Sequence, residues 1–400
     1  MRLVVAAFIA CLACATATQA QTLVQKANLV YQGAFRVPQG TTDMDTFNYG
    51  GTSLAFNPAN NSLFMTGHDW NQLTAEIKIP ALVNSTSIGN LNMGTLIQGF
   101  KDPTEGKLGS INPGDVNSKK VGGHLVYNGK LYVTGYSYYD GTGSQRYSHF
   151  VRPLSLSTTG QVVGPVLVGF DAHYTSGYMG LIPPEWVSQF GGPALTGNCC
   201  LAIASAQSNG PSATVFDPAA ITGSGAVAAT TLVGYPLGQQ LGPGEATTNP
   251  LYNLTTKIRG IVFPNGTRSV LFFGRHGIGT YCYGTGDECK DSADSSKGTH
   301  AYPYVYQVWA YDANDLLAVK AGTKQKQQVV PYSVWTFTLP FGGTGGQNLI
   351  GGAAYDAANS MIYVSQQCSD TNCAPVIHAF KVDGAVNALV PKPPTAVVAQ

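Results

Sequence analysis

Large polar side chains recur at one position of a repeated hairpin in this chain of 400 residues. At the end of each second strand, a small residue is followed by one of the residues His68, Tyr136, Gln207, Arg275 and Gln366. Two first strands also begin unusually, because His124 follows a Gly-Gly pair and Arg259 replaces the first glycine of another. Histidine and tyrosine transfer protons, and arginine binds a carboxylate through paired hydrogen bonds. These residue types therefore suit acid–base chemistry on an anionic ligand.

Five hairpins of one pattern would position these side chains. Counted from the second glycine of each pair, they begin at residues 51, 123, 192, 260 and 352. A third strand follows each hairpin, and a fourth follows all but the last, for which the segment 29–38 supplies a matching strand. Such units repeated around an axis predict an all-β propeller of four-stranded blades over residues 21–382, closed by the N-terminal strand. Five blades are favoured, six or seven and a two-sheet sandwich are the alternatives, and the longest helix is expected at 314–321.

In a propeller, the starts of the first strands and the loops after the second strands meet at one rim. Further polar and aromatic residues near this rim are candidates for binding a sugar: Asp69, Trp70, Tyr138, Gln207, Tyr281, His300, Gln366 and Gln367. Tyr281 and His300 belong to a long insertion in the fourth unit, which is either a lid over the rim or a solvated loop. Its acidic residues between 287 and 294 leave Ca²⁺ open as a ligand, although the spacing of a known calcium loop is missing.

The rim residues favour one reaction, the removal of the proton next to a uronic acid carboxylate. Arg259 and Arg275 would bind the carboxylate, and His68, His124, Tyr136 or His276 would act as base and acid. In architecture and rim residue types the chain resembles the secreted β-propeller polysaccharide lyases, such as the ulvan lyases and the rhamnose-glucuronate lyases. The resemblance covers most of the mature chain and implies polysaccharide cleavage by β-elimination. It includes no diagnostic motif, and the ulvan-type lyases have seven blades.

Three other functions remain open at the same rim. A non-catalytic carbohydrate- or surface-binding propeller needs the aromatic and glutamine side chains but no base. Glycoside hydrolysis in most families needs two carboxylates, whereas Asp69 is the only acid at the aligned rim positions. A metal-dependent enzyme would require the histidines to converge on one point, which the sequence does not establish.

The net charge and the two ends of the chain predict the compartment in which the protein functions and the partners that it binds. The net charge of +1 provides no electrostatic footprint for nucleic acid or an anionic membrane. Residues 1–20 have the basic start, apolar run and small-residue exit of a secretory signal peptide, and no later run is long and apolar enough to span a bilayer. We therefore expect a secreted, extracellular or periplasmic monomer that acts on a polysaccharide or oligosaccharide, with a flexible tail over 383–400.

Export would permit disulfides, and six cysteines remain after the predicted cleavage. They form three local couples, Cys199 with Cys200, Cys282 with Cys289, and Cys368 with Cys373. This local pairing is one of 15 connectivities that six cysteines allow.

Overall fold

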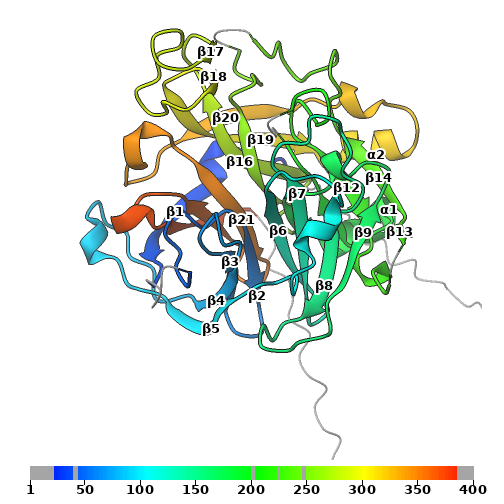
Figure 1. Cartoon of the computed structure of the whole chain (residues 1–400), viewed down its shortest axis with the longest axis horizontal. Coiled ribbons are helices and arrows are strands. Elements are labelled where there is room, and N and C mark those ends of the chain that lie inside the picture. Colours follow the sequence, from blue (N-terminus) through cyan, green and yellow to red (C-terminus); the bar gives the residue numbers. More distant parts are fainter. Residues whose placement is uncertain (1–21, 39–43, 200–202, 224, 246–248, 385–400) are drawn as a thin grey trace, which may run out of the picture.

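Five antiparallel sheets form the blades of a propeller in the computed structural model of this chain (Figure 1). The structure describes residues 22–38, 44–199, 203–223, 225–245 and 249–384. The predicted signal peptide therefore lies outside the described residues, as does the predicted tail after residue 384. The prediction of an all-β propeller with five blades is confirmed.

The first two blades follow the sequence directly. Blade 1 contains β2 (Leu54–Asn57), β3 (Ser62–Thr66), β4 (Thr74–Lys78) and β5 (Thr95–Lys101). Blade 2 contains β6 (Lys119–Tyr127), β7 (Lys130–Ser137), β8 (His149–Pro153) and β9 (Val163–Val168). The short strand β13 (Ala226–Val227) adds to its outer edge, parallel to β9.

Blades 3 and 4 carry the insertion and the two α-helices found among the described residues. Blade 3 contains β10 (Met179–Leu181), β11 (Ala194–Thr196), β12 (Ala213–Phe216) and β14 (Ala229–Val233), with α1 (Pro184–Phe190) between β10 and β11. Blade 4 contains β15 (Lys257–Val262), β16 (Ser269–Gly277), β19 (Tyr304–Asp312) and β20 (Ser333–Phe337). The insertion after β16 forms a separate hairpin of β17 (Cys282–Gly284) and β18 (Gly298–His300), and α2 (Ala313–Lys320) lies within one residue of the predicted helix.

Blade 5 joins the two ends of the described chain. It contains β21 (Ile350–Asp356), β22 (Met361–Gln366), β23 (Val376–Val382) and, as its outermost strand, β1 (Leu29–Arg36). Strand β1 pairs antiparallel with β23, from Leu29 opposite Val382 to Arg36 opposite Val376. The predicted closure of the ring by the N-terminal strand is therefore confirmed.

Apolar cores lie between neighbouring blades and hold the ring together. Phe64 of blade 1 packs in one cluster with Phe150 of blade 2, and Phe273 of blade 4 packs in another with Val364 of blade 5. All four side chains are almost fully buried. Because each blade buries apolar residues on both faces, its position is determined by both neighbours.

The third repeat was predicted in the wrong register. Its inner strand is β10 and not a strand beginning at Gly192, because the Gly191-Gly192 pair follows α1 and precedes the second strand, β11. Gly191 has a φ of 76° and accepts the left-handed conformation that ends this helix. The same dipeptide therefore serves as a helix cap here and not as the start of a blade.

Glycine pairs in the other inner strands allow close packing at the axis. A Cβ atom on Gly122 would lie 2.0 Å from the Ser176 carbonyl oxygen, and one on Gly351 would lie 1.7 Å from the Gly51 carbonyl oxygen. Both glycines occupy the extra position of a β-bulge, and Arg259 occupies the corresponding position in blade 4. A bulge redirects a side chain, and blade 4 has an arginine at this bulge position, where blades 2 and 5 have a glycine.

The strand order places two kinds of connection on one face of the ring. First strands begin and second strands end on this face, which we call the entry face. It therefore carries the loops between second and third strands and those that lead from one blade to the next.

Candidate functional site

A cavity of about 370 Å³ opens on the entry face between blades 2, 3 and 4. Blade 2 contributes three tyrosines, Tyr136, Tyr138 and Tyr139, and blade 3 contributes Tyr178, Asn198 and Gln207. Blade 4 contributes three cations, Lys257, Arg259 and Arg275, and its insertion adds Tyr283, Asp294, Lys297 and His300. Among the described lining residues Asp294 is the one carboxylate, so the cavity is cationic.

Lys257 is a cavity residue whose pKa is strongly lowered. It begins β15 directly opposite Arg275 in β16, so the two side chains share one face of the blade. The charge of Arg275, burial and the charge of Arg259 lower the pKa of Lys257 from 10.5 to about 7, against the opposing effect of Asp294. A substantial fraction of Lys257 is therefore an uncharged amine at neutral pH.

The two arginines that lower the pKa of this lysine have different surroundings. The Arg275 guanidinium lies 4.1 Å from the centre of the Tyr304 ring and donates a hydrogen bond of 2.9 Å to the Gln347 carbonyl oxygen. Its buried Nε has no hydrogen-bond partner among the described residues. Burial raises the pKa of the Tyr136 hydroxyl, and this effect outweighs the opposing charge of the nearby Arg259. Tyr136 is therefore protonated at neutral pH.

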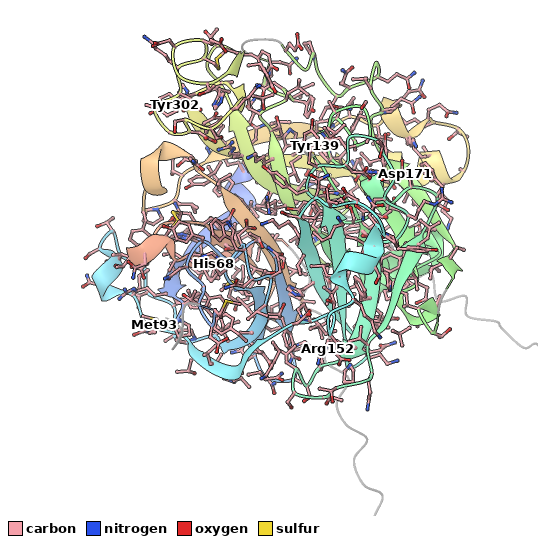
Figure 2. All side chains as sticks on the ribbon, in the orientation of Figure 1. His68, Met93, Tyr139, Arg152, Asp171 and Tyr302 are labelled. Atoms are coloured by element: carbon pink, nitrogen blue, oxygen red, sulfur yellow. A yellow bond between two sulfur atoms is a disulfide. The ribbon has the colours of Figure 1, made fainter. Side chains whose placement is uncertain are left out.

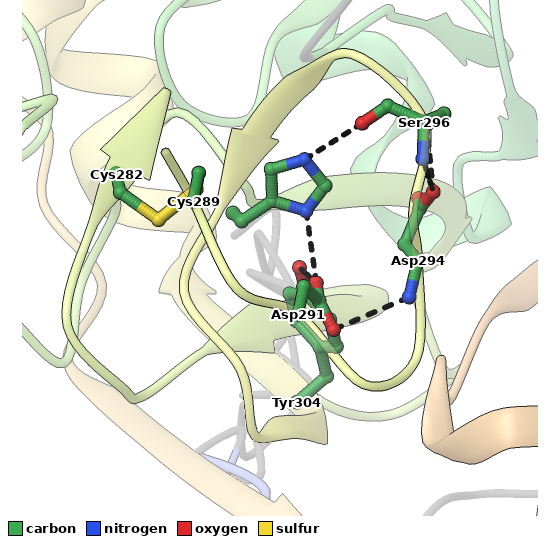
Figure 3. Close-up of a disulfide and its surroundings, with 7 residues drawn as sticks. Cys282, Cys289, Asp291, Asp294, Ser296 and Tyr304 are labelled. Carbon is green, nitrogen blue, oxygen red and sulfur yellow. Dashed lines mark hydrogen bonds and ion pairs between the residues drawn. A yellow bond between two sulfur atoms is a disulfide. The ribbon is translucent and has the colours of Figure 1, made fainter. Parts of the chain in front are cut away.

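The insertion in blade 4 is tied together beside the cavity (Figure 3). The Cys282–Cys289 disulfide closes its first part, and Asp291 accepts hydrogen bonds from His300 Nδ1 at 2.9 Å and from the Tyr304 hydroxyl at 2.5 Å. His300 Nε2 also bonds the Ser296 carbonyl oxygen at 3.0 Å. This network holds the segment that carries Asp294 and His300 against the cavity.

Asp294 is ionised in this setting. Burial raises the pKa of its carboxyl, but hydrogen bonds from Ser296 and the charges of Lys257 and Arg275 together lower it. The cavity therefore contains one carboxylate facing a larger group of cations.

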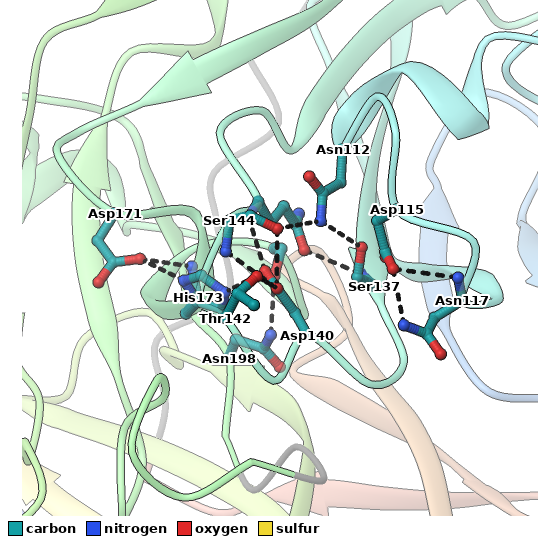
Figure 4. A network of polar contacts seen from close by, with 12 residues as sticks. Asn112, Asp115, Asn117, Ser137, Asp140, Thr142, Ser144, Asp171, His173 and Asn198 are labelled. Carbon is teal, nitrogen blue, oxygen red and sulfur yellow. Dashed lines mark hydrogen bonds and ion pairs between the residues drawn. The ribbon is translucent and has the colours of Figure 1, made fainter.

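The loop between β7 and β8, which carries Tyr138 and Tyr139, is organised by a buried carboxylate (Figure 4). Asp140 accepts hydrogen bonds from the Ser144 amide at 2.9 Å and the Gln145 amide at 2.6 Å, and it lies 3.0 Å from His173 Nε2. His173 Nδ1 lies 2.7 Å from an oxygen of Asp171. Burial lowers the pKa of His173, but the bonds and charges of Asp171 and Asp140 raise it overall.

All three predicted catalytic histidines lie outside the cavity lining, and two of them, His124 and His276, have partners within the ring. His124 Nδ1 is 2.7 Å from the Ser53 hydroxyl and its Nε2 is 3.0 Å from the Thr74 hydroxyl, and burial lowers its pKa to about 3. His276 contacts Thr256 and the Asn249 carbonyl oxygen through its two ring nitrogens, and burial lowers its pKa. Both histidines connect polar groups within the ring.

The remaining predicted residues divide between the cavity and its surroundings. Tyr136, Tyr138, Gln207, Arg259, Arg275 and His300 line the cavity. Gln366 is buried, donates to the Tyr306 hydroxyl at 2.6 Å and contacts His378 at 2.8 Å, whereas Gln367 donates to the Gly50 carbonyl oxygen at 3.0 Å. Tyr281 is half-buried outside the lining, where Tyr283 contributes instead. His68, Asp69 and Trp70 lie in the blade 1 loop beyond the cavity wall.

Lys257 and Asn198 are cavity residues that the sequence did not single out, and Asp294 was considered only as part of the acidic run that left Ca²⁺ open. A signal for Lys257 is present, because Lys-Val-Gly-Gly at 120–123 and Lys-Ile-Arg-Gly at 257–260 place a lysine at the same point of two inner strands. Asn198 was missed because the third blade was aligned in the wrong register, and it follows the end of the true second strand, β11.

The acidic insertion residues do not gather at one point. Asp291 bonds His300 and Tyr304, Asp294 faces the cavity, and Asp287 lies 3.7 Å from Lys290 on the surface. Over the described ranges no group of three or more His, Cys, Asp or Glu side chains is arranged to hold a metal ion.

Two of the three predicted disulfides are confirmed, Cys282–Cys289 and Cys368–Cys373. Cys199 is also disulfide-bonded, and Cys200 lies outside the described residues. These bonds fit an oxidising compartment. In the part of the chain that the structure covers, no helix has the length and apolar character to cross a membrane.

Comparison with known proteins finds only distant similarity. No protein-family model and no curated protein matches the chain. Among solved structures, the chain is similar to the arabinanase of Bacillus subtilis, with 11% identity, a TM-score of 0.44, and coverage of 87% of this chain and 96% of that one. It is also similar to an exo-1,5-α-L-arabinanase from a bovine ruminal metagenomic library (11% identity, TM-score 0.41, coverage 86% and 95%) and to a luciferin-regenerating enzyme (8% identity, TM-score 0.35, coverage 91% and 96%). The resemblance to propeller polysaccharide lyases stays a prediction.

Proposed function

We propose that the protein binds an acidic saccharide in the cationic cavity and cleaves it by β-elimination. The observation that carries this proposal is the meeting of Lys257, Arg259 and Arg275 at one cavity, with the pKa of Lys257 lowered to about 7. Arginine pairs bind a carboxylate through parallel hydrogen bonds, and a lysine with a pKa near neutrality can act as a base. The group thus provides both an anion site and a proton acceptor.

The reaction assigns one role to each of these side chains. The arginines would bind the uronic acid carboxylate and stabilise the negative charge that develops on it. The neutral amine of Lys257 would take the proton from the adjacent carbon, and that electron pair would form a carbon–carbon double bond as the bond to the glycosidic oxygen breaks. Tyr136, which is protonated, would donate its hydroxyl proton to the departing oxygen. Lys257 therefore replaces the histidines as the proposed base.

Glycoside hydrolysis is the second candidate, because Asp294 is an ionised carboxylate at the same cavity. Most glycosidases use a pair of carboxyl groups, and Asp294 has no carboxylate partner among the described lining residues. A cationic cavity also suits an acidic substrate better than the neutral sugars that many hydrolases cleave.

One experiment separates elimination, hydrolysis and binding alone. The purified mature protein is incubated with polygalacturonate and with alginate, and both ultraviolet absorbance and new reducing ends are measured. Elimination predicts that both signals rise together, because each cleavage creates one conjugated double bond and one new end. Reducing ends without absorbance would indicate hydrolysis, and saccharide binding with neither signal would contradict an enzymatic role on these polymers.

A further inference from the structure

Exposed aromatic side chains occupy only the entry face over the described ranges. They are Tyr49, Trp70, Tyr138, Tyr139, Tyr147, Phe170, Tyr283 and Tyr302. Each lies in a loop between second and third strands or in a connection from one blade to the next, as the strand order shows. Random placement would distribute such residues over both faces. The exposed aromatic rings are therefore concentrated on the face that carries the cavity.

Trp70 is the most exposed of these rings, with 86% of its surface accessible. It is not isolated, because the His68 ring lies 6.1 Å from it and the Tyr49 ring lies 5.5 Å from His68. The Trp70 amide also donates to His68 Nδ1 at 3.1 Å, which fixes the loop. Together Tyr49, His68 and Trp70 form an aromatic platform at the blade 1 loop, where Figure 2 labels His68.

A direct chain of contacts joins this platform to the cavity. Lys120 lies opposite Tyr136 in blade 2, and its ammonium contacts the Asp69 carboxylate at 2.6 Å and the Asp69 carbonyl oxygen at 2.7 Å. Asp69 precedes Trp70, and its charge acts on the cavity residue Tyr136. The platform therefore lies immediately beyond the blade 2 wall of the cavity and is held in place relative to it.

We propose that the aromatic platform of Tyr49, His68 and Trp70 binds a sugar ring of the same saccharide chain whose acidic unit occupies the cavity. This inference rests on the proposed function and specifies its substrate as a polymer. An indole ring offers a flat apolar face on which the C–H face of a pyranose stacks. The cavity, near the small end of the usual ~300–1,000 Å³ range for ligand sites, holds a short part of such a chain, and the platform would bind a unit further along it.

The test compares short and long oligosaccharides on matched variants. Affinities for a galacturonate disaccharide and octasaccharide are measured by calorimetry for the wild type, Trp70→Ala, Trp70→Phe and Met93→Ala. Met93 is the control, because it is an exposed apolar residue in the connection between β4 and β5, on the opposite face. Melting temperatures check that all variants remain folded.

We expect Trp70→Ala to weaken octasaccharide binding by roughly threefold to tenfold, the range for one aromatic contact, and to leave disaccharide binding unchanged. Trp70→Phe should restore most of the loss, and Met93→Ala should change neither affinity. An equal effect of Trp70→Ala on both ligands, or no effect on either, would overturn the aromatic platform while leaving the proposed cavity function intact. Failure of the wild type to bind either ligand would overturn both.

Discussion

Replacing Lys257 by methionine should stabilise the protein while removing its activity. The Arg275 charge, burial and the Arg259 charge lower the pKa of this lysine from 10.5 to about 7. At about 1.4 kcal/mol per pKa unit, the charged form destabilises the folded state by roughly 5 kcal/mol relative to the neutral amine. Water in the open cavity screens part of this energy. We therefore expect Lys257→Met to raise the free energy of unfolding by roughly 2 kcal/mol at about pH 6.

The dependence of this gain on pH follows from proton binding. The unfolded lysine keeps its proton up to about pH 10.5, whereas the folded lysine loses it near pH 7. Between these values the unfolded state binds more protons, so the stability contributed by this site rises with pH and is lost as pH falls toward 7. The advantage of Lys257→Met over the wild type should thus be largest below pH 7 and shrink as the pH rises toward 10.

Urea unfolding followed by tryptophan fluorescence over this pH range measures the effect. Lys297→Met is the matched control, because Lys297 is an exposed lysine of the same cavity. A Lys257→Met protein that is less stable than the wild type at every pH would refute the reasoning, because it would mean that the lysine does not carry an unfavourable charge.

Three further changes test the site and its supports. Arg259→Gln should weaken binding of a galacturonate oligosaccharide by ~10- to 100-fold, the loss of one charged hydrogen-bonded contact of about 1.5–3 kcal/mol, and calorimetry would contradict the assignment if the affinity were unchanged. Although burial lowers the pKa of His173, the bonds and charges of Asp171 and Asp140 raise it above its ordinary 6.5. The stabilisation from the protonated histidine is therefore present below pH 6.5 and is lost as the pH rises through the folded pKa. The urea midpoint of the wild type should fall over this pH range, and the fall should disappear in His173→Gln. Replacing Cys282 and Cys289 by alanine should cost roughly 2 kcal/mol of stability and also weaken saccharide binding, whereas a loss of stability with unchanged binding would show that the insertion does not shape the cavity.

The repeated hairpins made the fold predictable from the sequence. Turn residues and apolar alternation located four of the five inner strands, and the unpaired segment at 29–38 correctly predicted the closure by β1. The third blade failed because its inner strand, β10, is only Met179–Leu181 and has little pattern of its own. The Gly191-Gly192 pair that follows β10 along the chain ends helix α1 instead. Local sequence does not distinguish a glycine pair that ends a helix from one that begins an inner strand.

The site was predictable only in part, since a residue's chemistry depends on its neighbours in space. Aligning the second strands correctly brought Tyr136 and Arg275 to one rim. The lowered pKa of Lys257 is caused first by the charge of Arg275 on the neighbouring strand, and no sequence motif predicts that these two residues are paired. The hydrogen bonds of His124 were not predictable, because its partners Ser53 and Thr74 belong to the neighbouring blade and are distant in sequence.

The most direct test of the central claim is the pH dependence of kcat/KM for the cleavage of polygalacturonate, followed by ultraviolet absorbance. If the Lys257 amine is the base, the rate should rise with pH and level off near pH 7, following the pKa of this group in the free enzyme. The signal should be absent in Lys257→Met, which we expect to be folded and at least as stable as the wild type. A Lys257→Met protein that cleaves at the wild-type rate, or a wild type that binds the polymer with no rise in absorbance, would contradict the account.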